Sequence, residues 1–144
     1  MIRKINISDK EFYIKSVKDF YSSEAVLHSI PETNITKTFD ELMNSENYAQ
    51  CYIFEQDGER AGYALLAKTY SQEAGGTVLW IDEIYILPEF RSKGIGSHFF
   101  KFLKENSNTA RLRLEFCPSN KKAIEIYKRQ GFVPLAYEQM IYEE

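Results

Sequence analysis

Cysteine is scarce in this sequence. Cys51 and Cys117 are the only two among 144 residues, and they form no Cys-x-x-Cys pair. Metal sites and redox motifs usually depend on closely spaced ligands of this kind. We therefore expect two small thiols that are buried or half-buried, and neither a metal ion nor a redox centre.

Long apolar runs are also absent. No stretch is long enough to span a membrane, and the start Met1-Ile2-Arg3-Lys4 leads into mixed polar sequence instead of the apolar core of a signal peptide. The net charge of -3 argues against nucleic acid as the main partner and is compatible with a cationic substrate. We expect a cytoplasmic protein without a membrane or nucleic-acid partner.

Apolar residues are abundant enough to form a core without disulfide staples. Hydrophobic residues make up 44% of the chain and aromatic residues 15%, and this length is typical of one domain. No internal repeat, linker or low-complexity tract interrupts the sequence. We expect a single domain over residues 1–144.

The hydrophobic periodicity changes along the chain between the helical and the strand pattern. Asp57-Gly58 is a strong hairpin signal between two strands, and Asn120 and Gly131 fit the start and the end of a helix. The pattern predicts an α/β protein with strands at 2–7, 49–55, 60–70, 77–87 and 111–116, helices near 8–21, 31–43, 95–105 and 121–130, and one or two final strands within 132–142.

The most informative stretch joins a predicted strand to a predicted helix through a basic turn, residues 88–97. Gly94 and Gly96 lack a β-carbon, so the backbone there can bring its N–H groups close to an anion. The following helix directs its positive end to the same point, and Arg91 and Lys93 add positive charge. The loop therefore predicts a phosphate-bearing cofactor.

Two common phosphate-binding motifs do not fit this loop. A P-loop needs four residues between its first glycine and a Gly-Lys-Ser/Thr group, and the chain has no such run. A dinucleotide fingerprint needs a third glycine where Phe99 stands. The remaining pattern, Arg-x-x-Gly-x-Gly, resembles the coenzyme A pyrophosphate loop of the GNAT superfamily of N-acetyltransferases.

A second stretch strengthens this resemblance. Leu114-Glu115-Phe116, Asn120, Tyr127 and Gly131-Phe132 are similar to the second GNAT signature, in which a strand ending in Glu precedes a capped helix that carries Tyr. The two signatures occur in the family's order over residues 77–133. The resemblance implies the GNAT acyl-CoA N-acyltransferase fold, a mixed sheet with helices on both faces.

Residues 81–88, Ile-Asp-Glu-Ile-Tyr-Ile-Leu-Pro, are similar to the strand that precedes this loop in diamine acetyltransferases. The resemblance implies acetyl-CoA as cosubstrate, with no metal. Dimers are common among relatives, so we consider a homodimer as a hypothesis. No feature of this sequence argues for it. The residues implied in coenzyme binding are Ile84, Tyr85, Ile86, Arg91, Ser92, Lys93, Gly94, Ile95, Gly96, Ser97, Asn120 and Tyr127.

Acetyl transfer to an amine requires three separate steps. The amine must lose a proton, the carbonyl oxygen gains charge, and the leaving thiolate needs a proton. By the family pattern, the strand at 84–86 diverges from its neighbour, the N–H of Ile86 faces the thioester oxygen, and Tyr127 is the general acid. Tyr127 also has a plain structural interpretation, because an aromatic residue at that helical spacing packs well.

Three carboxylates compete for the role of general base. Alternation along the strand places Asp82 on the face of Ile84 and Ile86 and turns Glu83 to the opposite face. Asp82 matches the acidic residue of diamine acetyltransferases, and Glu115 matches the base proposed in enzymes that acetylate the N-termini of ribosomal proteins. We rank Asp82 first, Glu115 second and Glu83 third, although each could simply bind a neighbouring backbone group or lysine.

These observations predict an acetyl-CoA-dependent N-acetyltransferase that acts on a primary amine by direct attack in a ternary complex. The candidate acceptors are the amines of polyamines, of other small molecules, and of proteins or peptides. The alternative is a catalytically silent module that senses acyl-CoA or docks onto a partner. The three carboxylates and Tyr127 favour the enzyme.

Overall fold

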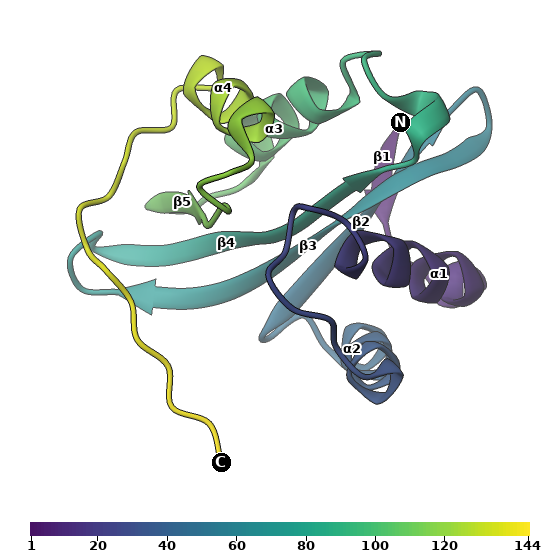
Figure 1. The fold of residues 1–144 in the computed structure, drawn as a ribbon, viewed down its shortest axis with the longest axis horizontal. Helices are drawn as coiled ribbons and strands as arrows, with labels where there is room; N and C mark the ends of the chain where they lie inside the picture. Colours follow the sequence, from purple (N-terminus) through teal and green to yellow (C-terminus); the bar gives the residue numbers. More distant parts are fainter.

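The computed structural model describes residues 1–144, and it has the predicted α/β architecture (Figure 1). Two short 3-10 turns, Ile7–Asp9 and Pro88–Phe90, join the helices and strands. The strands are β1 (Ile2–Lys4), β2 (Ala49–Gln56), β3 (Glu59–Ser71), β4 (Gly76–Ile86) and β5 (Arg111–Leu114), and the helices are α1 (Lys10–Tyr21), α2 (Glu32–Asn44), α3 (Ile95–Asn106) and α4 (Lys121–Arg129).

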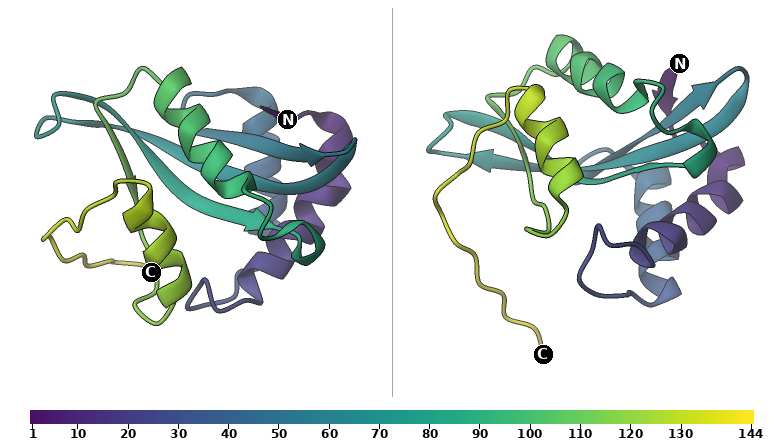
Figure 2. Two further views of the ribbon diagram at one scale, coloured as in Figure 1. Left: turned by 90° about the horizontal axis from the view of Figure 1, so that it is seen from above. Right: turned by 45° about the horizontal axis from the view of Figure 1, so that its top comes forward.

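The five strands form one mixed sheet in the order β1-β2-β3-β4-β5. All neighbours are antiparallel except β4 and β5, which are parallel because α3 crosses over between them. Helices α1 and α2 cover one face and α3 and α4 lie on the other, as Figures 1 and 2 show. Each face buries its own apolar cluster, so the sheet separates two cores.

The final strand predicted within 132–142 does not form. No helix or strand follows α4, and the last backbone hydrogen bond of the chain runs from the N–H of Phe132 to the carbonyl of Tyr127. The segment leaves the body of the molecule and ends away from the sheet (Figure 1). Alternating residues favour a strand, but a strand forms only through backbone hydrogen bonds to a neighbouring strand, and residues 133–144 make none.

Both cysteines are buried and unpaired. This confirms the expectation of thiols that pack as small apolar groups. None of the helices combines the length and the apolar character needed to cross a membrane.

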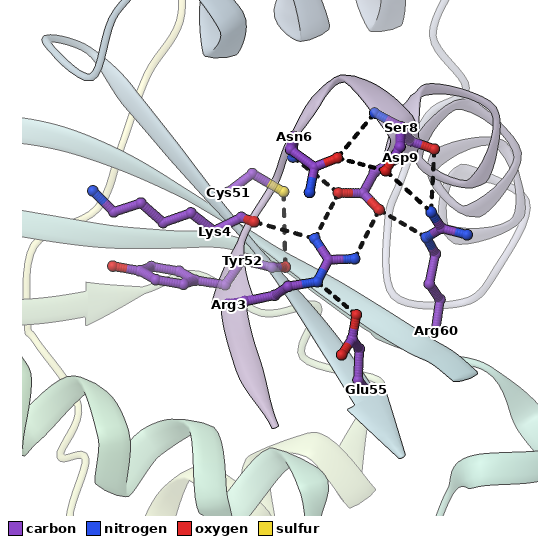
Figure 3. Close-up of polar contacts among 9 residues, drawn as sticks. All are labelled: Arg3, Lys4, Asn6, Ser8, Asp9, Cys51, Tyr52, Glu55 and Arg60. Carbon is purple, nitrogen blue, oxygen red and sulfur yellow. Dashed lines mark hydrogen bonds and ion pairs between the residues drawn. The ribbon is translucent and has the colours of Figure 1, made fainter. Parts of the chain in front are cut away.

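A buried ion cluster ties the start of the chain to the β2–β3 hairpin (Figure 3). The carboxylate of Asp9 is fully buried and accepts two hydrogen bonds from Arg3, at 2.8 and 2.9 Å, and one from Arg60 at 2.7 Å. Arg3 also pairs with Glu55 of β2 at 2.6 Å. Burial alone would raise the pKa of Asp9, but the bonds from Arg3, the Asn6 N–H and Arg60 outweigh it and lower the pKa to about 2.

We predict that Asp9→Asn lowers the free energy of unfolding at pH 7 by about 2 kcal/mol, because it leaves two arginines without their shared anion. Urea unfolding followed by circular dichroism measures this loss. Glu46→Gln is the control, since the Lys4–Glu46 pair is more than half exposed on the lysine side and contributes little.

The loss should depend on pH. The folded-state pKa of Asp9 lies below the ordinary value of 3.8, so its stabilisation is complete above about pH 4 and disappears as the pH falls toward 2. The difference between wild type and Asp9→Asn should therefore shrink at pH 3. A difference that stays constant down to pH 2 would refute the role of this charge.

Candidate active site

The site begins where β4 and β5 separate. Their parallel pairing ends at Ile81 and Leu114, whereas β4 continues to Ile86 while paired only with β3. The backbone of β4 from residue 82 to 86 therefore has no strand on its β5 side. This opening agrees with the divergence that the family pattern implied, and it leaves polar backbone groups available to a ligand.

The open segment of β4 lies unusually close to β3 at Gly62. A β-carbon at Gly62 would lie only 2.1 Å from the carbonyl oxygen of Tyr85, so no other residue fits at this position of β3. The requirement is not visible in the sequence, because it arises from the approach of a second strand.

A β-bulge at Asp82 changes the direction of the acidic side chains. Leu65 pairs with Glu83 and the next residue, Leu66, pairs with Ile81, so Asp82 is the extra residue of β4. As a result Ile81 and Ile84 pack into the same apolar cluster beneath α3. The bulge interrupts the simple alternation that the prediction assumed between Asp82 and Ile84. Glu83 lies, as predicted, on the face of Tyr85, opposite to Ile84 and Ile86.

Glu83 is buried between the sheet and the end of α1. Its two carboxylate oxygens accept hydrogen bonds from the hydroxyls of Tyr21 and Tyr63, each at 2.7 Å. Burial raises the pKa of Glu83, and the two tyrosine bonds only partly oppose this. Sequence reasoning did not identify Tyr63, since 20 residues separate it from Glu83 and only the β3–β4 pairing brings them together.

Asp82 lies at the mouth of the opening and is exposed. Its surroundings nevertheless displace part of its water, and with the charges of Glu83 and Glu115 they raise its pKa to about 6. A carboxyl group with this pKa exchanges a proton close to neutral pH. Of the three carboxylates, Asp82 thus has the chemistry of a general base.

Glu115 directly follows β5 and is also exposed. Its charge acts on Asp82 across the gap between the two strands. The three predicted carboxylates therefore gather at one end of the sheet, which makes this end attractive to a cation. Glu83, fully engaged by two tyrosines, is the least suited of the three to accept a proton from a substrate.

The loop after β4 forms the predicted anion cradle. Ser92 and Gly94 both have left-handed backbone conformations, with φ values of 62° and 80°. No backbone or side-chain acceptor within the protein binds the N–H groups of residues 92–97, so six consecutive donors surround the start of α3. Gly96 belongs to α3 and does not have the special conformation expected of it, whereas sequence reasoning missed the strained backbone of Ser92.

The basic side chains of the loop are exposed beside these donors. Arg91 donates from Nε to the carbonyl oxygen of Ile86 at 2.8 Å and lies over the ring of Tyr85. The ammonium of Lys93 lies 5.4 Å from the centre of the Phe90 ring. Arg91 thus links the cradle to the open end of β4, and its other guanidinium nitrogens are free for an anion.

Helix α4, which follows the short strand β5, carries Tyr127. Asn120 caps this helix by accepting a hydrogen bond from the Ala123 N–H at 3.3 Å. The ring of Tyr127 packs against Phe100, Phe116 and Phe132. Its hydroxyl has no protein partner. Tyr127 lines a groove of about 770 Å³ together with Leu114, Glu115 and residues 133–135 of the C-terminal segment, whereas Asp82 and the loop at 91–97 lie outside this groove. Burial raises the pKa of Tyr127, so the hydroxyl keeps its proton and can donate it.

Comparison with known proteins gives one consistent family. A sequence profile of the acetyltransferase (GNAT) family matches residues 14–132. The chain is 25% identical to the mouse (Mus musculus) protein thialysine N-epsilon-acetyltransferase over 90% of its own length and 82% of that protein. It is 26% identical to the uncharacterized N-acetyltransferase YhfO of Bacillus subtilis (strain 168), over 85% of this chain and 75% of that one.

Solved structures share the fold. A possible acetyltransferase from Clostridium difficile 630 superposes with a TM-score of 0.85 and 21% identity, over 100% of this chain and 97% of that chain. The complex of AAC(6')-Iy with the bisubstrate analog CoA-S-monomethyl-acetylneamine superposes with a TM-score of 0.79 and 17% identity. The superposition covers 100% of this chain and 97% of that chain. The chain belongs to the acetyltransferase (GNAT) family and is an acetyl-CoA-dependent N-acetyltransferase.

Proposed function

We propose that this enzyme transfers the acetyl group of acetyl-CoA to a primary amine on a small cationic molecule. The observation that carries the proposal is the gathering of Asp82, Glu83 and Glu115 at the open end of β4, where the pKa of Asp82 rises to about 6. The name of the mouse relative, which specifies an N-epsilon amine, supports a side-chain amine as the acceptor.

The cradle suits the pyrophosphate of coenzyme A. Residues 92–97 offer free N–H groups, the positive end of α3 lies at the same point, and Arg91 and Lys93 add charge. The exposed backbone of Ile84, Tyr85 and Ile86 is available to the amide groups of the pantetheine arm, and the N–H of Ile86 would donate to the thioester oxygen. Asn120 contributes by holding α4 in place.

Asp82 removes the proton from the amine. At pH 7 an amine with a pKa near 10.4 must spend about 4.6 kcal/mol to become neutral, so nearby negative charge alone would only hold it protonated. A positioned acceptor is needed, directly or through one water. Glu83 and Glu115 hold the pKa of Asp82 high enough for it to accept this proton.

Tyr127 supplies the proton that the leaving sulfur requires. No protein group binds its hydroxyl, and Tyr127 lines the groove that also contains Leu114 and Glu115. Direct attack by the amine fits the cysteines, because neither is placed as a nucleophile. Cys51 is buried with a pKa raised well above its ordinary value, and the buried Cys117 thiol donates to the carbonyl of Ala25.

The test is release of the coenzyme A thiol from acetyl-CoA over a panel of polyamines, lysine analogues, amino acids, aminoglycosides and peptides. We expect turnover with at least one small cationic amine. Tyr127→Phe should lower kcat about 10²-fold, the usual contribution of a general acid, and leave the affinity for coenzyme A nearly unchanged.

Tyr48→Phe is the matched control, because Tyr48 is exposed and lies outside the groove of Tyr127. Coenzyme A binding without turnover on any amine would refute the proposed function. An unchanged rate in Tyr127→Phe would remove only Tyr127 from the mechanism.

The charge of Glu83 should affect the pH dependence of the reaction. In the wild type, kcat/KM should fall as the pH drops below about 6, because Asp82 becomes protonated. Glu83→Gln removes a neighbouring negative charge, so the pKa of Asp82 should decrease and the acidic limb of the profile should move to lower pH.

Glu125→Gln, on the exposed side of α4, should leave this limb where it is. Asp82→Asn should abolish the limb together with most of the activity. Loss of the limb in Glu115→Gln, with the limb retained in Asp82→Asn, would instead make Glu115 the base.

Two glycines allow a matched test of the cradle. Gly94 and Gly58 have the same left-handed φ of 80°, and an added β-carbon meets no atom at either position. Substitution by alanine should therefore lower the free energy of unfolding by a similar amount at each site, roughly 1–2 kcal/mol, through backbone strain. Only Gly94→Ala should weaken coenzyme A binding, by about tenfold, as measured by isothermal titration calorimetry. An equal loss of affinity in Gly58→Ala would show that the effect is one of global stability.

A further inference from the structure

Glu83 is one of two carboxylates that the fold buries, and it is the one without a cation. Asp9, the other, is bound by the guanidinium groups of Arg3 and Arg60. Glu83 is 7% exposed and takes part in no ion pair. Burying an anion without a cation costs free energy, because water no longer solvates its charge. The charge of Glu83 should therefore destabilise the folded chain, which indicates a role outside stability.

Two tyrosine hydroxyls support this carboxylate. Tyr21, the last residue of α1, donates to Oε2, and Tyr63 of β3 donates to Oε1, each at 2.7 Å. A hydroxyl carries no net charge, so the two bonds offset only part of the lost hydration, and the pKa of Glu83 stays above its ordinary value of 4.5. The same bonds fix the carboxylate in the open stretch of β4, directly after Asp82.

The other titratable groups around Glu83 add no positive charge. Tyr13 of α1 and Cys51 of β2 lie close enough for the charge of Glu83 to act on them, and burial raises the pKa of both. Both groups are therefore neutral at pH 7. On β4 itself the neighbouring ionisable group is Asp82, whose pKa the charge of Glu83 helps to raise. Glu83 thus acts on Asp82 while no cation neutralises it.

The two tyrosines differ in their surroundings. Tyr63 is fully buried in the central strand of the sheet, and its ring packs against Tyr13 and Tyr85. Tyr21 is only half-buried, and its ring packs edge-to-face on Phe20. Removal of the Tyr21 hydroxyl therefore disturbs less of the core, and it separates the effect of the hydrogen bond from that of packing.

We propose that Tyr21 is a positioning residue for the reaction: with Tyr63 it holds the carboxylate of Glu83, negatively charged and without a cation, beside Asp82. The fold loses stability through this charge, as functional sites often do. The charge in turn strengthens the binding of the proton that Asp82 takes from the amine. This inference rests on the proposed role of Asp82 as the base, but its consequence for stability requires no turnover.

The first test is the stability of the full chain, measured by urea unfolding followed by circular dichroism. Glu83→Gln keeps the shape of the side chain and can still bond to both hydroxyls, since an amide accepts one bond and donates another. We expect its unfolding midpoint at pH 7 to equal or exceed that of the wild type, whereas Asp9→Asn, which removes a charge that two arginines bind, should lower the midpoint.

The effect of Glu83→Gln on stability should depend on pH. Because the folded-state pKa of Glu83 is raised, the cost of its charge applies above that pKa and disappears as the pH falls below 4.5. The stability of Glu83→Gln relative to the wild type should therefore be higher at pH 7 than at about pH 4. A midpoint at pH 7 clearly below that of the wild type overturns the proposal.

The second test is the acidic limb of kcat/KM with an amine that the enzyme acetylates. Tyr21→Phe removes one bond from Glu83, so Glu83 keeps its proton to higher pH and acts less on Asp82. The limb should move to lower pH by about half a pH unit, in the same direction as in Glu83→Gln. The double variant should show no further shift than Glu83→Gln alone, because both changes act through one charge.

Tyr52→Phe is the matched control. Tyr52 is also half-buried, but its ring packs against Phe99 and Phe102 on the α3 face of the sheet, opposite to Glu83, so the limb should stay in place. An unmoved limb in Tyr21→Phe, or a further shift in the double variant, overturns the role of Tyr21. Absence of turnover with every amine instead refutes the proposed function, and the stability of Glu83→Gln still tests the cost of the buried charge.

Discussion

The site depends on the separation of two parallel strands. β4 and β5 pair only as far as Ile81 and Leu114, because β4 continues with its own pairing to β3 while β5 ends. Backbone groups that a neighbouring strand would normally satisfy are left free at this point. The anion cradle follows β4, whereas Glu115 and helix α4 with Tyr127 follow β5, so the separation of the two strands sets these groups on either side of the gap in the chain order.

The electrostatics of this opening are set by residues far away in the sequence. Tyr21 at the end of α1 and Tyr63 in β3 hold the buried carboxylate of Glu83, and the charge of Glu83 contributes to the raised pKa of Asp82. The first third of the chain thus contributes, through Tyr21, to the environment of Glu83, although it carries no recognisable motif. The ion cluster of Asp9 stabilises the same region by fastening the chain start to the β2–β3 hairpin.

Local rules predicted most of the fold correctly. The Asp57-Gly58 turn, the Asn120 cap, the left-handed Gly94 and the alternation of helices and strands all depend on neighbouring residues, which a sequence displays directly. Predictions from neighbouring residues failed where the structure depends on pairing with a strand that is distant in the sequence. The bulge at Asp82 follows from the register with β3. The expected final strand did not form, since residues 133–144 make no backbone hydrogen bond.

The sequence by itself determined the phosphate-binding loop, the α/β order, the identity of the three carboxylates and Tyr127 as a candidate acid. Each of these is written in residue types at short spacing, where backbone preference and side-chain chemistry act locally. Only the tertiary structure buried Glu83 between Tyr21 and Tyr63 and raised the pKa of Asp82 to about 6, since burial and charges on other segments produce such shifts. It alone also showed that Gly62 admits no side chain, because this limit arises from the close approach of β4 and not from neighbouring residues in the sequence.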